Sequence, residues 1–462
     1  MQSLFAIAHL TLKAAFRFRL VAALSVILVS VILILPWIIR DDGTARGFTQ
    51  IILTYTLSVI TALLGMATLW LACGTLAREI EECQIQMLAV KPVPRWKIWF
   101  GKWLGITLLN ALLLAVSGGC VYGLLHYKSN GLPPAEQVIL RNEVFVARAG
   151  IREESPNIEG DVETLLKERL KDAQVASMDR AFVRKQLREQ VIARQQVVPS
   201  GYVRRWQIKL GALKDFVRNQ PLYLRVKFFV PPEASSTLTP KNFEGIWQVG
   251  PPDTSKRVVK KVSLAADTFH EFPIPADLFD NDGLLTIDYQ NHSETAVLFP
   301  IGEGLEVLYR ESGFAVNFAR GLAVILCWMG LLAALGLAAA SFLSFPVAAF
   351  VSLGMLTILF SGGTISAVVQ EGTIVGISEE GGPSVPSALD AVAVPAFKVM
   401  LNVINLVRGV SPIDNLSTGR SITWWQLAGA FGQIVLLFGG LFALAGISIL
   451  TRRELATAQH QQ

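Results

Sequence analysis

Residues 79–102 read EIEECQIQMLAVKPVPRWKIWFGK, a charged stretch between two long apolar runs. Its first half is rich in helix-forming residues, and its second half contains Pro92 and Pro94. Proline lacks an N–H group and disfavours helix at the residue before it, so this pair ends the helix. The stretch therefore predicts a short rigid helix between two membrane spans, with a charged surface on which a soluble protein docks.

Acidic and apolar side chains along this helix, about Glu79–Val90, indicate how a partner binds. They are Glu79, Glu81, Glu82, Ile85, Met87 and Leu88. Acidic side chains favour a helix N-terminus and offer ion pairs to a partner, and the apolar ones would fill a groove on it. From Arg95 to Lys102, basic residues alternate with tryptophans, as is typical of the membrane–water interface. An ordinary basic loop with no partner is the alternative.

Six apolar runs are long enough to cross a bilayer, for which about 20 residues suffice. They are Leu20–Ile39, Ile51–Ala77, Trp103–Leu125, Phe314–Phe342, Pro346–Val369 and Trp425–Leu450. The basic flanks of these runs fall on one side if there are six spans. They are Lys13, Arg17, Arg19, Arg78, Lys91, Arg95, Lys97, Lys102, Arg452 and Arg453. Because basic flanks stay in the cytoplasm, we expect both termini and the loop at 78–102 to be cytoplasmic.

Two further apolar segments do not have the pattern of a simple membrane span. Residues 1–19 carry apolar side chains at helical spacing with Lys13 and Arg17 on the polar side, which predicts an amphipathic surface helix. The alternative is an extension of the first span. Residues 391–407 contain Pro395 and Lys398, which favours a re-entrant or interfacial segment on the outer side. A seventh span is the alternative there.

Residues 127–312 form a soluble domain of different composition, expected outside the cytoplasm. They hold 25 Lys/Arg and 25 Asp/Glu, most of the 77 charged residues of the chain, and no cysteine. Residues 162–197 are rich in helix formers with opposite charges three or four apart. From Tyr202 onward, β-branched and alternating segments such as LYLRVKFFV and LLTIDYQN are separated by turn sequences such as FDNDG. This pattern predicts an α+β domain with a helical arm and a β-sandwich.

The sequence contains few residues in patterns typical of catalysis, metal binding or nucleotide binding. No phosphate-binding Gly-x-x-x-x-Gly-Lys-Ser/Thr motif is present, and none of the five histidines forms a pair at metal-ligand spacing. We therefore expect no catalytic residue, no metal ligand and no cofactor bound by this chain. The excess of basic residues belongs to the apolar part, which indicates topology signals and contacts with membrane lipid rather than nucleic acid. Arg320 lies inside the fourth apolar run, where it either reaches the lipid headgroups or contacts an anionic substrate.

The chain resembles the permease subunits of ABC-2-type ABC transporters in three places. The 78–102 loop matches their acidic helix, their Leu-Ala-x-x-Pro-Val-x-Arg pattern (Leu88–Arg95) and their Gly-Lys (Gly101-Lys102). The ending ISILTRREL is similar to their Arg-Arg-Glu terminus, and the order of surface helix and six spans is similar too. Cys83-Gln84 replaces a common Gly-Thr pair, and residues 127–312 replace a loop that is short in many members.

The resemblance covers the N-terminal membrane part, 1–126, and the C-terminal membrane part, 313–462. It implies an α-helical polytopic permease of the cytoplasmic membrane that works in export. Two copies, or this chain and a paralogue, would form the pathway. A separate cytoplasmic ATPase would bind ATP and Mg and dock on the coupling helix, with Pro92 and Arg95 among the coupling residues. In the alternative function, the ATPase drives movement or signalling of the 127–312 domain without passage of a substrate. The sequence does not identify the substrate.

Overall fold

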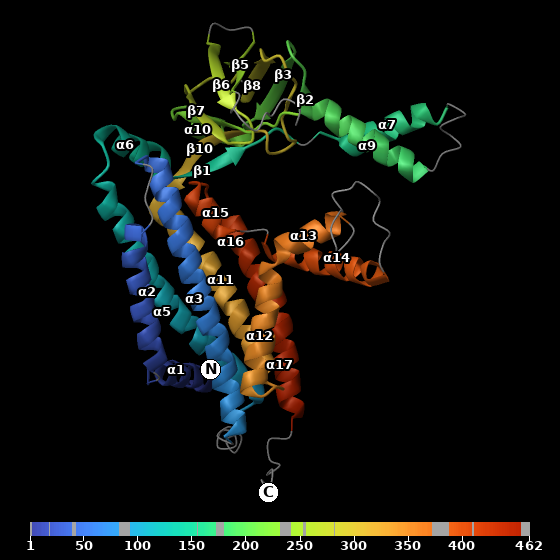
Figure 1. Ribbon diagram of the computed structural model, residues 1–462. Helices are drawn as coiled ribbons and strands as arrows, with labels where there is room; N and C mark the ends of the chain where they lie inside the picture. Colours follow the sequence, from blue (N-terminus) through green and yellow to red (C-terminus); the bar gives the residue numbers. More distant parts are fainter. Residues whose placement is uncertain are drawn as a thin grey trace. The chain divides into compact units, whose positions relative to one another are not determined.

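The computed structural model describes residues 2–17, 19–38, 43–82, 93–154, 156–171, 180–231, 242–252, 256–280, 282–371, 388–408 and 411–453. The chain forms two compact units. Residues 1–147 and 312–462 make a helical unit, and residues 148–311 make a β unit (Figure 1). The expected domain began at residue 127. Residues 127–147 instead belong to the helical unit, because the short helices there pack on a long one.

The helical unit consists of long apolar helices and short connecting ones. These are α1 (Gln2–Arg17), α2 (Arg19–Ile38), α3 (Ala45–Glu81), α5 (Arg95–Ser129), α6 (Pro134–Ile139), η1 (Leu140–Val144), α11 (Phe314–Ala340), α12 (Phe345–Phe360), α13 (Gly362–Glu371), α14 (Ala388–Arg408), α15 (Pro412–Ser417), α16 (Trp424–Ala430), η4 (Phe431–Gly439) and α17 (Gly440–Arg452). The last three form one continuous stretch, Trp424–Arg452.

Four helices are long and apolar enough to cross a membrane, or up to six if each of two bent pairs is one span. The four are α3, α5, α11 and Trp424–Arg452. One bent pair joins Gln2–Phe16 to Val21–Leu35 at 67°, so the N-terminal residues form a helix of their own. The other joins Phe345–Ile358 to Gly362–Val369 at 54°. Six spans are thus the upper limit of what the helices allow.

The expected fifth span, Pro346–Val369, is not straight. It breaks at Ser361, where α12 ends and α13 begins. Serine and the two glycines that follow it are poor helix formers, and Gly/Ser pairs are a common site of helix kinks. After the break, α13 packs against α14, the helix that contains the expected interfacial segment 391–407.

Helix α11 is the centre of the helical unit. Of its apolar window 78% is buried within the molecule, against 28% for that of Trp424–Arg452. It packs against α3, α5, α12, α15 and α17. Its last turns are rich in alanine and glycine, which lets neighbouring backbones approach closely. At Gly336 an added Cβ would lie 2.7 Å from the Cβ of Ala72 on α3, so only glycine fits there.

The β unit is built on two four-stranded sheets and one two-stranded pair. Its strands are β1 (Val146–Ile151), β2 (Val197–Val198), β3 (Val203–Lys209), β4 (Leu222–Val226), β5 (Asn242–Val249), β6 (Val258–Ala265), β7 (His270–Ile274), β8 (Leu284–Asn291), β9 (Val297–Leu298) and β10 (Leu305–Gly313). The sheet orders are β1-β10-β4-β7 and β3-β8-β5-β6, and β2 pairs with β9. The pairs with a defined register, such as β3 with β8 and β4 with β7, are antiparallel.

One hydrophobic core lies between the two sheets, as in a β-sandwich. Trp206 and Trp247 stack with ring centroids 6.0 Å apart, and Phe299 meets Trp206 edge to face at 5.2 Å. Leu224 and Val307, from the other sheet, belong to the same cluster. These aromatic residues are thus core residues.

A helical arm extends from the sandwich (Figure 1). It consists of α7 (Ile158–Arg169) and α9 (Arg180–Gln196), which pack against each other. A separate small apolar cluster of Val162, Val183, Leu187 and Val191 holds them together. The helix-rich region expected at 162–197 is therefore confirmed as a two-helix arm. Short helices η2 (Gly211–Leu213) and α10 (Lys214–Val217) complete the unit.

The complete sandwich, residues 146–313, is expected to fold as a soluble fragment. Its core draws on both sheets, and the sequence in this range contains no cysteine. Thermal unfolding followed by circular dichroism should be cooperative and unchanged by reductant. Trp247→Ala should lower the free energy of unfolding by about 3–5 kcal/mol, because it empties the centre of the core. A fragment that melts without a cooperative transition would contradict an independent unit.

Candidate functional site

The residues predicted to contact a partner lie at the end of the helical unit where α3 stops and α5 starts, here called the Glu79 end. Glu79 and Glu81 close α3 and Glu82 is its C-cap, while Arg95 is the first residue of α5. The acidic residues were expected to open a separate helix, and this was wrong: they close α3. No glycine or proline interrupts the chain between Ala77 and Glu82, so α3 continues through the charged residues.

The other predicted partner contacts are outside the described residues. They are Ile85, Met87, Leu88 and Pro92.

An ion pair joins α3 to α5 at this end. Lys102 is 3% exposed, and its Nζ lies 2.5 Å from Oε1 of Glu79. The same ammonium group donates a hydrogen bond to the carbonyl oxygen of Thr75 at 3.2 Å. A charge removed from water is costly unless it is paired and hydrogen-bonded. Glu79 therefore compensates the buried lysine and fixes the two helices to each other.

Arg95 ties the start of α5 to the end of α17. Its Nη1 donates hydrogen bonds to the carbonyl oxygens of Leu450, Thr451 and Arg453 at 2.6–2.9 Å. These carbonyls belong to the last turn of α17, where a helix has no partners of its own for them. A cation is also favourable at a helix C-terminus. Arg453 in turn donates to the carbonyl oxygen of Ser341, the C-cap of α11, at 3.1 Å.

Glu81 ties the end of α3 to the start of α12. Its Oε1 accepts a hydrogen bond of 2.8 Å from the backbone N–H of Phe345, the first residue of α12. Ser344, the N-cap of α12, makes no side-chain capping bond, so Glu81 supplies a cap from another helix. The guanidinium of Arg78 lies 4.4 Å from the centre of the Phe345 ring. Glu81 is thus a structural residue, although its side chain is exposed.

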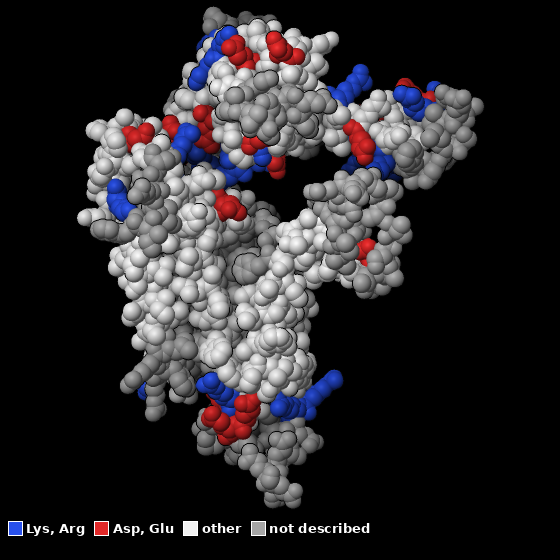
Figure 2. All heavy atoms as spheres, in the orientation of Figure 1, with Lys and Arg blue, Asp and Glu red and all other residues white. Residues whose placement is uncertain are grey.

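At the Glu79 end the charged residues join α3, α5, α11, α12 and α17. Figure 2 shows acidic and basic side chains gathered at this end of the helical unit, next to a broad band of uncharged residues. A force applied where α3 meets α5 would reach the other helices through these bonds.

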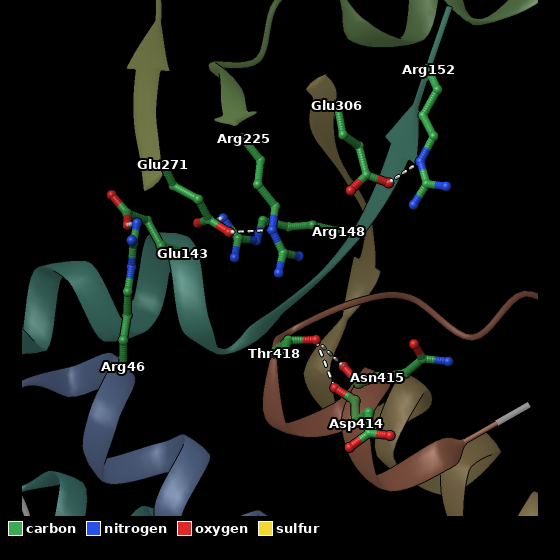
Figure 3. Close-up of polar contacts among 10 residues, drawn as sticks. All are labelled: Arg46, Glu143, Arg148, Arg152, Arg225, Glu271, Glu306, Asp414, Asn415 and Thr418. Carbon is green, nitrogen blue, oxygen red and sulfur yellow. Dashed lines mark hydrogen bonds and ion pairs between the residues drawn. The ribbon is translucent and has the colours of Figure 1, made fainter. Parts of the chain in front are cut away.

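The opposite end of the helical unit, here called the Ala45 end, is tied in a similar way. Oε2 of Glu136 on α6 accepts a hydrogen bond from the N–H of Ala45 at 2.7 Å. Arg46 forms an ion pair of 2.5 Å with Glu143 of η1 (Figure 3). These contacts hold the connection from α5 to β1 against the first turn of α3.

An aromatic stack lies at the same end. His126 of α5 stacks on Phe145 with ring centroids 4.9 Å apart, and Phe145 stacks on Phe314 at 5.1 Å. Tyr122 and Phe318 extend the stack along α5 and α11. Phe145 immediately precedes β1, and Phe314 immediately follows β10. The stack therefore clamps both chain connections to the β unit, and the sequence analysis missed it.

Arg320 is buried within the described part of the helical unit. It is 7% exposed, and its Nη1 donates to the carbonyl oxygen of Ile422 at 2.9 Å. Trp424 covers the guanidinium, with its ring centre 4.5 Å away. Asn317, one turn earlier on α11, accepts from the N–H of Ile422 at 2.7 Å. Arg320 and Asn317 together fix the connection between α15 and α16 to α11.

Several buried charged groups of the β unit are paired with one another. Arg148 lies 2.9 Å from Glu271, and Arg225 reaches the same carboxylate at 3.8 Å (Figure 3). Asp288 is bound by Arg205 and Arg257. Burial opposes ionisation of Asp288, but its hydrogen bonds and ion pairs with the two arginines outweigh burial and lower the pKa of this carboxyl. A lowered carboxyl pKa stabilises the fold at neutral pH, and this contribution is lost as the pH falls below about 4.

One groove of about 460 Å³ lies on the β unit beside strand β3. Glu153 on its wall accepts from the N–H of Gln207 at 3.1 Å, and Glu154 pairs with Lys209 at 3.2 Å. Its charges are thus engaged within the protein. Across the described ranges, no group of three or more His, Cys, Asp or Glu residues could hold a metal ion.

The fold and its charged clusters define a broad class of protein. Several long apolar helices indicate a membrane-embedded protein that carries an inserted β-sheet unit. Comparison with protein-family models, with curated proteins and with solved structures found no match to the chain.

We expect Lys102→Met to lower the free energy of unfolding of the purified chain in detergent by about 3 kcal/mol, because it leaves Glu79 without its cation. The double variant Lys102→Met/Glu79→Gln should recover most of this loss, since removing both charges leaves no buried ion unpaired. The control Lys97→Met, which removes a lysine without a described ion pair, should change little. Equal losses in the single and double variants would contradict a pairwise role.

Proposed function

We propose that this chain is the permease subunit of an ABC-2-type transporter, moved by a separate cytoplasmic ATPase that binds ATP and Mg. The observation that carries the proposal is the set of bonds at the Glu79 end. A partner bound between α3 and α5 would pull directly on both helices. Through Glu81 and Arg95 it would also pull on α12 and α17.

The proposed permease works as a pair, either two copies or this chain with a paralogue. The Glu79 end would face the cytoplasm, because Arg78, Arg95, Lys97 and Lys102 lie there beside the C-terminal Arg452 and Arg453. The β unit, inserted between spans on the opposite side, would then be extracytoplasmic. The proposed direction is export, and the spans would be surrounded by membrane lipid.

Glu81 and Glu82 allow docking to be separated from folding. Glu82→Lys should abolish co-purification of an ABC ATPase with the tagged full chain from native membranes. It should change the melting temperature less than Glu81→Lys does, because interactions of an exposed charge contribute little to stability. Glu81→Lys should lower the melting temperature as well, because it removes the cap on α12.

Two further variants serve as controls for this experiment. Glu81→Gln keeps an acceptor for the N–H of Phe345 and should restore the melting temperature. Glu303→Lys reverses an exposed charge on the β unit and should leave co-purification intact. If Glu82→Lys retains the ATPase as well as Glu303→Lys does, docking at this site is wrong.

A second candidate function is transmission of movement to the β unit without passage of a substrate. The aromatic stack at the Ala45 end favours it. Strands β1 and β10 are neighbours in one sheet, and Phe145 and Phe314 hold their connections against each other. Displacement of α5 relative to α11 would therefore act on a single pair of adjacent strands.

Phe145→Ala tests transmission in the complex of chain and ATPase. Under transmission, nucleotide should change the hydrogen exchange of residues 146–151 and 305–313 in the wild type. The variant should lose this change and keep ATP hydrolysis, because the stack is interrupted and the Glu79 end is untouched. Val138→Ala, an exposed residue of α6, is the control. Wild-type exchange changes confined to the helical unit would favour transport instead.

A further inference from the structure

Two cations lie more than one turn inside the candidate spans of the helical unit, and their surroundings differ. Lys102 on α5 has the carboxylate of Glu79 at 2.5 Å. Arg320 lies in the second turn of α11, roughly 9 Å along the helix axis from its first residue. Its described partners are the carbonyl oxygen of Ile422 and the ring of Trp424. Both are neutral groups.

The positive charge of Arg320 is therefore not compensated within the part of the chain that the structure describes. Its Nε is buried and has no hydrogen-bond partner. Asp414 is the acidic residue of α15, which packs against α11, and its side chain is exposed and forms no ion pair with Arg320. Figure 3 shows Asp414 with Thr418, whose hydroxyl donates to the carbonyl oxygen of Asp414 at 2.7 Å.

A buried guanidinium without an anion is unfavourable, and arginine cannot lose its proton to escape the cost. A carbonyl oxygen and an aromatic face each stabilise a cation, but neither carries a full negative charge. An ionisable residue inside a membrane span therefore points to a ligand of opposite charge.

The position of Arg320 favours a phosphate group over other anions. The planar guanidinium binds two phosphate oxygens at once, which an ammonium group does not. Trp424, which lies against the guanidinium, and the next residue, Trp425, are 64% and 85% exposed. Exposed tryptophans are typical of the level at which lipid headgroups lie. We propose that Arg320, beneath Trp424, binds a phosphate group, either that of an anionic phospholipid or that of a soluble phosphate ester. The site does not depend on the proposed ATPase partner.

The experiment measures how phosphate-bearing ligands stabilise the full-length chain in nanodiscs. Discs of phosphatidylcholine alone are compared with discs containing phosphatidylglycerol, and with phosphatidylcholine discs to which glycerol 3-phosphate is added. Both lipids carry phosphate, but only phosphatidylglycerol has a net negative charge. The readout is the increase in melting temperature caused by each ligand. We expect the wild type to show such an increase and Arg320→Gln to lose at least about three quarters of it, since the charge that attracts the anion is gone.

Two matched variants separate binding from a merely structural role of Arg320. Asn317→Ala breaks the neighbouring bonds to the backbone of Arg420 and Ile422 but keeps the cation. It should lower the melting temperature in every disc and leave the ligand-induced increase intact. Arg46→Gln removes an arginine that already has Glu143 as its anion, and should also leave the increase intact.

The outcomes are distinct. An increase with phosphatidylglycerol alone identifies a lipid as the source of the phosphate, and an increase with glycerol 3-phosphate identifies a soluble ester. Either result supports the site if Arg320→Gln loses the increase. A wild type that responds to neither ligand, or an Arg320→Gln variant that responds as the wild type does, overturns the proposal. An Arg320→Gln variant that melts lower in all discs yet keeps the increase shows that the residue is structural only.

Discussion

The ion pair between Lys102 and Glu79 sets the geometry on which the helical unit depends. An ammonium group this deeply buried requires a carboxylate at contact distance, so α3 and α5 are fixed in one register. Once they are fixed, Glu81 and Arg95 come to the positions from which they cap α12 and α17. Helix ends in an apolar unit cannot leave their N–H and carbonyl groups unsatisfied. The charged residues at this end therefore have a structural role that does not depend on a partner.

These structural contacts change the interpretation of the charged residues at the end of α3 and the start of α5. Residues with internal bonds, such as Glu79, Glu81 and Arg95, transmit displacement between helices. Glu82 lies exposed just after them, at the C-cap of α3. At the Ala45 end, side chains also join separate elements, but by aromatic stacking: Phe145 stacks on Phe314. The helices are thus joined by charged groups at one end and by aromatic rings at the other.

The sequence predicted the elements better than their contacts. Hydropathy located the spans at 51–77 and 103–125. A span predicted from hydropathy ends where charged residues begin, but α3 continues to Glu81 because no residue there breaks the helix. Strand β5 is hard to predict because Gly245 interrupts its β pattern. In the fold, the ring of Tyr289 occupies the space above that glycine, and an added Cβ would lie 2.2 Å from it. The bonds from Arg95 to α17 join residues far apart in the chain, and no local pattern reports them.

Arg320 shows why an isolated charge in an apolar run cannot be interpreted from its position alone. A residue that reaches the headgroups, a pathway residue and a structural residue all look the same in a hydropathy profile. The fold separates them by what surrounds the guanidinium: a carbonyl, an indole ring and no described anion. Lys102 provides the comparison, since an equally buried cation in the same unit has its carboxylate. The protein thus supplies an anion to Lys102 and, among the described residues, only neutral groups to Arg320.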